Sequence, residues 1–318
     1  MMKPIDLGSG ISLIDVFDLG KENRTGTYVI HEEELTLIET SASPSIPYLL
    51  KGLEALEIDP ADVKYIIVTH IHLDHSGGAG LLLEKCPNAQ IIVHPKGKRH
   101  LADPSRLIQG ARAVYGDQFD ELFHPILPVP EDRLVSKEDG GTLQIGENRI
   151  LTFLDTPGHA NHHFSIYDPY SAGIFTGDTV GVYYSEILSE GLEFYLPSTS
   201  PNQFNPQAML AAADRMEGLN IDRIYFGHYG MSENPGLVFK QLRYWLPIFV
   251  DTGRSIMEEH KDASFDEKTI YISTALFEKV RAYLTEHNVV ISQEFRETIE
   301  LDLTVCAMGI VDYFGKRK

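Results

Sequence analysis

Four residues of metal-ligand type lie within six positions of one another in the first quarter of the chain. The segment 69–78 reads THIHLDHSGG and contains His70, His72, Asp74 and His75. Imidazole nitrogens and carboxylate oxygens suit borderline divalent ions such as zinc, iron, manganese or cobalt, and the glycine pair allows a tight turn. The alternative is a polar loop whose histidines cap the next helix. So many donors in so short a stretch favour a metal site.

Three more residues of the same type follow apolar runs elsewhere in the chain. The run ILTFLDTPG leads to His159, AGIFTG leads to Asp178, and RIYFG leads to His228. Loops at one edge of a layered sheet commonly collect functional groups, because the strands hold them rigidly. We therefore expect these residues to converge with the first group.

The elements that must position these residues alternate between strand and helix patterns. Short β-like runs over 11–39 predict an antiparallel meander. Beyond it, apolar residues at helical spacing alternate with apolar runs such as YIIV and AQIIV. Asn205 followed by Pro206 predicts the start of a helix. This order predicts an α/β layered fold whose sheet is covered by helices.

Two regions depart from this pattern. Residues 97–139 are rich in charges and turns, which predicts an insertion beside the sheet. Beyond residue 230 the chain changes to long helical patterns. We therefore expect a catalytic domain over 1–245 and a mostly helical C-terminal extension over 246–318, which caps the active site or builds a homodimer interface.

Composition limits the partners of the protein. The 318 residues carry a formal net charge of −19 at pH 7, which disfavours a nucleic-acid partner because phosphate binding relies on clustered Lys and Arg. No apolar stretch reaches the ~18 residues of a membrane-spanning helix. The only cysteines, Cys86 and Cys306, indicate free thiols of a reducing compartment and hence a cytoplasmic location. We expect a small-molecule substrate, with neither nucleic acid nor membrane as a partner.

The spaced motifs resemble those of the metallo-β-lactamase superfamily. Its His-x-His-x-Asp-His hallmark matches residues 70–75, and TPGH at 156–159, TGD at 176–178 and FGH at 226–228 follow in the family's order. The resemblance spans roughly residues 10–245. It implies a four-layered αββα sandwich with a metal centre at one edge of its two sheets, followed by the helical C-terminal extension.

The resemblance also implies seven ligands and two divalent metal ions, with zinc as the first choice and iron or manganese as alternatives. The first ion would be bound by His70, His72 and His159. The second would be bound by Asp74, His75 and His228, and Asp178 would bridge the two. A bridging Asp in place of Cys resembles the hydrolase and oxygenase branches more than the lactamases.

The expected chemistry is hydrolysis. A hydroxide between two divalent ions is a nucleophile at neutral pH, and the ions polarise a carbonyl oxygen. A lactone or ester is therefore the expected substrate, ahead of a thioester, and Asp74 is the expected catalytic residue that orients the hydroxide and passes a proton to the leaving group.

Other functions remain open. One is a single-iron oxidative enzyme that resembles the persulfide dioxygenases, and another is a phosphodiesterase or nuclease of the tRNA-processing type, which the acidic charge disfavours. A purely structural metal site is the least favoured, because such sites are closed and commonly rich in thiolates. Flavodiiron-type oxygen reductases typically have a carboxylate where His72 stands, which argues against that activity.

Aromatic and imidazole side chains beside the predicted ligands are the expected substrate contacts: Tyr183, Tyr184, Tyr195, Tyr229 and His163. The tyrosines that follow Asp178 would form an apolar wall, or else only pack their loop against the extension. His163 would orient a ligand or play a structural role. Lactonases of the family carry a Tyr where Gly181 stands, which weakens the lactonase assignment.

Overall fold

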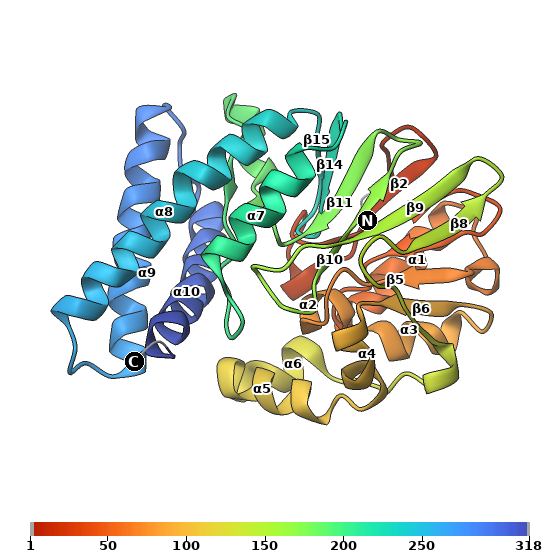
Figure 1. The fold of residues 1–318 in the computed structure, drawn as a ribbon, viewed down its shortest axis with the longest axis horizontal. Coiled ribbons are helices and arrows are strands. Elements are labelled where there is room, and N and C mark those ends of the chain that lie inside the picture. Colours follow the sequence, from red (N-terminus) through yellow and green to blue (C-terminus); the bar gives the residue numbers. More distant parts are fainter. Residues whose placement is uncertain (1–2, 317–318) are drawn as a thin grey trace. The chain divides into compact units, whose positions relative to one another are not determined.

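The computed structural model describes residues 3–316 (Figure 1), which form two compact units. The first unit contains 3–155, 162–177 and 220–234, and the second contains 156–161, 178–219 and 235–316. Within the described range no helix is both long and apolar enough to cross a membrane.

The first unit contains a seven-stranded sheet within the described residues. In spatial order its strands are β1 (Ile5–Asp6), β2 (Ile11–Asp15), β3 (Gly26–Ile30), β4 (Thr36–Ile38), β5 (Tyr65–Ile67), β6 (Gln90–Val93) and β7 (Leu134–Ser136). Strands β1 to β4 pair antiparallel, which confirms the predicted meander, and β4 to β7 pair parallel. Strands β4, β5 and β6 therefore end at the same edge.

A second sheet of the first unit has six strands within the same described range. In spatial order they are β15 (Met231–Ser232), β14 (Arg223–Phe226), β11 (Gly173–Gly177), β10 (Phe164–Asp168), β9 (Arg149–Asp155) and β8 (Thr142–Gly146). Strands β9 and β11 each pair antiparallel with β10, and β14 pairs parallel with β11. Strands β9, β11 and β14 thus run in one direction and end at one edge of this sheet.

The two sheets face each other across a buried apolar layer. Ile38 and Ile67 of the first sheet pack in the same cluster as Phe153 and Phe175 of the second. Tyr28, in the same cluster, donates its hydroxyl to the carbonyls of residues 226 and 230 at 2.7 and 2.6 Å. This layer joins the two sheets and so fixes their strand ends relative to each other.

Helices cover the other face of the first sheet. Helix α1 (Ile46–Ala55) buries Leu49 and Leu53, and α3 (Ala79–Lys85) buries Leu82 and Leu83, in one cluster with strand residues. Figure 1 shows both helices beside this sheet. The α and β layers of the predicted fold are thereby confirmed.

The region 97–139 is more regular than the sequence suggested. It contains α5 (Ser105–Tyr115), α6 (Phe119–Phe123) and β7, and most of α4 (Pro95–Ala102). Phe119 and Phe123 are buried beside Leu73. The apolar residues of α5 have helical spacing and pack beside that cluster, but none is fully buried, and the charges around them masked the helix in the sequence.

The remaining helices of the first unit are short. They are α2 (Leu73–Ser76) and the 3-10 helices Asp18–Gly20, Ser43–Ser45, Pro60–Asp62, Gly116–Gln118 and Glu131–Arg133.

The second unit is mainly helical. It contains the short strands β12 (Val182–Tyr183) and β13 (Tyr195–Leu196), a 3-10 helix Ser185–Glu190, and the helices α7 (Pro206–Glu217), α8 (Pro235–Glu259), α9 (Phe265–Glu286) and α10 (Gln293–Gly315). Helices α8, α9 and α10 contact one another, with Trp245 of α8 5.1 Å from the Tyr283 ring of α9. The helical C-terminal extension is confirmed, although the expected boundary at residue 245 falls inside α8.

Asn205 caps α7 as predicted, because its side-chain oxygen accepts a hydrogen bond from the Ala208 N–H at 3.1 Å. We expect Asn205→Ala to lower the free energy of unfolding by about 1 kcal/mol, and Asn205→Gly to lower it by only a few tenths. Urea denaturation of both variants measures the difference. Equal loss in both would contradict a capping role.

Candidate metal centre

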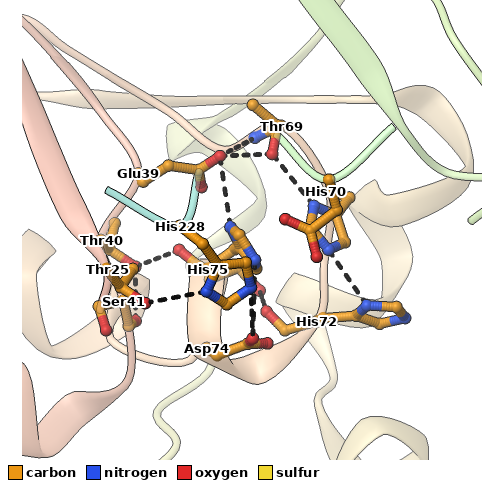
Figure 2. A network of polar contacts seen from close by, with 12 residues as sticks. Thr25, Glu39, Thr40, Ser41, Thr69, His70, His72, Asp74, His75 and His228 are labelled. Carbon is orange, nitrogen blue, oxygen red and sulfur yellow. Dashed lines mark hydrogen bonds and ion pairs between the residues drawn. The ribbon is translucent and has the colours of Figure 1, made fainter. Parts of the chain in front are cut away.

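The first histidine motif lies where β5 gives way to α2. His70 lies at a bend three residues after β5, and His72 occupies the N-cap position of α2 with an extended backbone and no side-chain capping hydrogen bond. Asp74 and His75 lie in the single turn of α2, so the helix brings them back toward the histidines that precede it. Figure 2 shows these side chains gathered at one place.

One carboxylate oxygen of this motif faces two imidazoles. Asp74 Oδ2 lies 3.6 Å from His75 Nε2 and 3.6 Å from His228 Nε2. Each of these separations exceeds a hydrogen bond. They match the spacing of about 3.4 Å between two ligand atoms that a tetrahedral zinc ion holds at 2.0–2.1 Å. The ligand atoms of the three residues all lie within 4.8 Å of one another, which suits one cation.

A second pair of imidazoles lies beside this group. His70 Nε2 is 3.1 Å from His72 Nδ1, and the His70 ring is 4.1 Å from the His75 ring. Two ring nitrogens at this separation share either a proton or a cation. The first unit therefore brings together five of the seven expected ligands: His70, His72, Asp74, His75 and His228.

Glu39 supports two of these ligands, His70 and His75, and was not among the residues predicted from the sequence. It follows β4 directly and is 1% exposed. Its Oε1 accepts hydrogen bonds from the N–H and the hydroxyl of Thr69, and lies 3.6 Å from His75 Nδ1. The Thr69 hydroxyl in turn is 3.0 Å from His70 Nδ1. The Nδ1 atoms of both rings thus face oxygen acceptors, which is the arrangement that orients Nε2 of a histidine toward a metal (Figure 2).

A second buried carboxylate, that of Asp18, contacts His228 through Thr25. Thr25 Oγ1 donates to Asp18 Oδ2 at 3.3 Å and lies 3.4 Å from His228 Nδ1. Burial raises the pKa of Asp18, and Arg24, whose Nε is 3.5 Å away, opposes that rise. In the sequence, Glu39 and Asp18 are distinguished only as acidic residues that follow a strand of the first sheet. Acidic residues are also common in exposed turns after strands, so this position alone did not identify them.

The second unit brings together the two remaining expected ligands. His159 Nε2 lies 3.6 Å from Asp178 Oδ2, and both residues are buried. Ser198 contacts both, since its carbonyl oxygen is 3.0 Å from His159 Nδ1 and its hydroxyl donates to Asp178 Oδ2 at 3.2 Å. His159 and Asp178 thus repeat the carboxylate and imidazole spacing of the first group.

The expected substrate contacts divide into two sets. In the second unit, Tyr184 donates its hydroxyl to Asp302 at 3.0 Å and Tyr195 donates to Glu193 at 2.9 Å. Burial raises the pKa of Tyr183 to about 12. These contacts favour the packing alternative for Tyr184, whose partner lies on α10.

In the first unit, Tyr229 lies in the buried layer between the sheets, and the His163 ring is 5.0 Å from that of His70. His163 is fully buried, as a residue that supports His70 would be. Gly181 has a φ of +103°, and a Cβ there would overlap the carbonyl oxygen of Leu196. The backbone at this position therefore excludes the tyrosine of the lactonases.

Comparison with known proteins shows which family the chain belongs to. The model of the metallo-beta-lactamase superfamily matches residues 21–228. The metallo-beta-lactamase fold-containing protein ST1585 of Sulfurisphaera tokodaii is 29% identical over 224 residues, which cover 69% of this chain and 77% of that protein. The anaerobic nitric oxide reductase flavorubredoxin of Vibrio vulnificus is 24% identical over 247 residues, or 72% of this chain. The match covers only 44% of the flavorubredoxin.

Solved structures share the fold at low sequence identity. A metallo-beta-lactamase family protein, TTHA1429 from Thermus thermophilus, matches with a TM-score of 0.66 and 19% identity, over 98% of this chain and 95% of that one. The flavodiiron protein of Giardia intestinalis matches with a TM-score of 0.54 and 16% identity, over 80% of this chain and 68% of that one. The first of these matches extends over the C-terminal helices as well.

Proposed function

Because this chain belongs to the metallo-beta-lactamase superfamily, we propose that it is a metal-dependent hydrolase with two divalent ions bound by seven ligands. The observation that carries the proposal is the position of Asp74, whose Oδ2 lies 3.6 Å from the Nε2 atoms of both His75 and His228. The imidazoles fit such ions, since oxygen atoms face the Nδ1 of His70, His75 and His228, an arrangement that orients each Nε2 as the metal-binding nitrogen.

The strand directions support one centre that includes His159 and Asp178. Strands β9, β11 and β14 run in the same direction, and His159, Asp178 and His228 follow their C-terminal ends by four, one and two residues. Since each follows such a strand end within four residues along the chain, we infer that all three bind the same centre. We expect replacement of His159 or Asp178 by Ala to lower the number of bound ions.

Asp74 is the proposed catalytic residue. When bound, the ions activate a water molecule and polarise a carbonyl oxygen. The Asp74 side chain is 28% exposed, whereas that of His75 is inaccessible to solvent. Asp74 is therefore accessible to an incoming molecule, as the partly exposed His72 also is, and its carboxylate can orient water and pass a proton to the leaving group.

The proposed substrate is a small carbonyl compound, with a lactone or ester ahead of a thioester. The net charge of −19 disfavours polyanionic substrates. The crowded backbone at Gly181 removes one contact of the lactonases, so an ester is as good a candidate as a lactone. Zinc is the first choice of metal for the nitrogen-rich ligand set, with iron and manganese as alternatives.

An oxidative function is the second candidate, because flavorubredoxin is among the relatives. His72 stands where flavodiiron proteins typically have a carboxylate, which favours the hydrolase. Metal analysis of the purified protein separates the two. About two ions per chain without oxygen uptake support the hydrolase. A single iron with oxygen uptake would support a dioxygenase.

The substrate class is tested with lactones, esters, thioesters and phosphodiesters at matched metal occupancy. We expect turnover of a lactone or ester. Failure of all four classes in protein with two bound ions would contradict the hydrolase proposal.

Removal of the metal should lower thermal stability, because a ligand that binds only the folded state stabilises it. At a free metal concentration of 100 times Kd the stabilisation is about 2.7 kcal/mol. Thermal melts before and after chelation, and after metal is restored, measure it. A His75→Ala variant serves as the control and should respond less, because it lacks a ligand of the second ion. An unchanged melting temperature in the unmodified protein would contradict tight binding.

A further inference from the structure

Ser198 holds both expected ligands of the second unit. A carbonyl oxygen only accepts hydrogen bonds, so its 3.0 Å contact requires His159 Nδ1 to carry the proton. In that tautomer Nε2 is the unprotonated ring nitrogen, which is the form that binds a metal. The hydroxyl of Ser198 fixes the carboxylate of Asp178 at 3.2 Å. A displacement of Ser198 would therefore move two ligands at once.

The segment that carries Ser198 lies directly on α10. Gly309 of α10 is buried, and a Cβ added to it would overlap the Thr199 carbonyl oxygen and lie 2.6 Å from the Ser200 carbonyl carbon. Thr199 Oγ1 also donates to the carbonyl oxygen of Cys306 at 3.0 Å. The Cys306 sulfur is 3.5 Å from the Thr199 nitrogen. The helix and the segment thus meet backbone to backbone, without space for a methyl group.

The contacts of α10 lie in one stripe. Asp302, Cys306 and Gly309 are spaced four and three residues apart, so they lie on the same helix face. Asp302 accepts the hydroxyl of Tyr184, which belongs to the loop that follows Asp178. The stripe therefore contacts the chain on both sides of β13, at Tyr184 and at 199–200.

We propose that this stripe of α10, formed by Asp302, Cys306 and Gly309, positions His159 and Asp178 for metal binding through Ser198. The C-terminal extension is then a part of the metal centre as well as a packing element. The inference rests on the proposed function, because it takes His159 and Asp178 as metal ligands. Gly309 is a positioning residue, since it contacts neither ligand itself.

The test compares two glycine-to-alanine variants of the full chain. Gly309→Ala places a methyl group against 199–200. Gly253→Ala is the matched control, because its Cβ would overlap the Ile310 side chain and so disturb α10 packing from α8. Metal affinity is measured by competition with a chromophoric chelator, and the ligand field by the visible spectrum of the cobalt-substituted protein. Melting temperatures monitor the general loss of stability.

We expect Gly309→Ala to weaken metal binding about 10- to 100-fold and to change the cobalt spectrum. Gly253→Ala should keep the metal affinity within about threefold of that of the unmodified protein and leave the cobalt spectrum unchanged. We expect this even if its melting temperature falls as much as that of Gly309→Ala. Equal affinities and identical spectra in the two variants and the unmodified protein would overturn the inference.

A second variant keeps the test decisive if Gly309→Ala fails to fold. Ser198→Ala removes the hydroxyl that holds Asp178 but retains the carbonyl that orients His159. We expect about a tenfold loss of metal affinity, and an unchanged affinity would overturn the inference. The unmodified protein separates the two proposals. If it binds no metal, the proposed function fails, whereas metal binding that is insensitive to Gly309 and Ser198 contradicts only the role of α10.

Discussion

Asp74→Asn should lower the turnover number by about two to four orders of magnitude, the contribution typical of a positioned acid or base. Asparagine has the same shape and keeps one oxygen toward His75 and His228, but it carries no charge and cannot accept a proton. Steady-state kinetics and metal content are measured on the same sample. Glu33→Gln, at an exposed carboxylate of the first unit, is the matched control and should leave both unchanged.

Metal content separates the two roles of Asp74. If excess metal restores turnover, the carboxylate serves only as a ligand. If turnover stays low with both ions bound, Asp74 handles the proton. Full turnover with full metal content in Asp74→Asn would exclude Asp74 from the mechanism.

The local part of the site could be predicted from the sequence because its ligands are close in the chain. His70, His72, Asp74 and His75 are held by a strand end and a single helical turn, whose geometry the residue spacing determines. His228 lies more than 150 residues further on, where its position after a strand predicted convergence but only the resemblance assigned it to a particular ion. Its approach to Asp74 depends on how the two sheets pack, which no local pattern specifies.

The supporting residues were hidden for a different reason. Glu39 is one of 46 acidic residues, and its position after a short strand resembles that of many solvated acids. Only burial and the contacts with Thr69 and His75 distinguish it. Gly309 reads in the sequence as a weak helix former, and its close approach to Thr199 comes from tertiary packing alone.

The elements of the fold divide in the same way into those that local sequence patterns predicted and those that they did not. The meander over 11–39, the cap at Asn205 and the C-terminal helices depend on local patterns, and all three were predicted. The helix α5, in the region expected to be an irregular insertion, does carry apolar residues at helical spacing that pack against one buried cluster: Leu107, Ile108, Ala111 and Tyr115. The charges and turns of the surrounding region masked this period in the sequence.

Replacement of Glu39 should have the second-largest effect, on metal affinity. Its carboxylate is the acceptor behind both His70, through Thr69, and His75. Removal of such a partner typically costs 10- to 100-fold in metal affinity, because the ligand rings lose their preferred orientation and tautomer. We therefore expect Glu39→Ala to weaken metal binding by that factor, measured by chelator competition at neutral pH.

The conservative variants Glu39→Gln and Glu39→Asp show which property of Glu39 matters. Glutamine keeps an oxygen for the Thr69 hydrogen bonds but loses the charge that faces His75, whereas aspartate keeps the charge and loses reach. Glu39→Ala also leaves the buried Thr69 N–H without its acceptor, which lowers the free energy of unfolding of the metal-free protein by about 1–3 kcal/mol. If orientation of the ligands is the main role, Gln should exceed Ala in metal affinity by a larger factor than the difference between their metal-free stabilities accounts for. Affinities that follow only metal-free stability across the three variants would instead make Glu39 a purely structural residue.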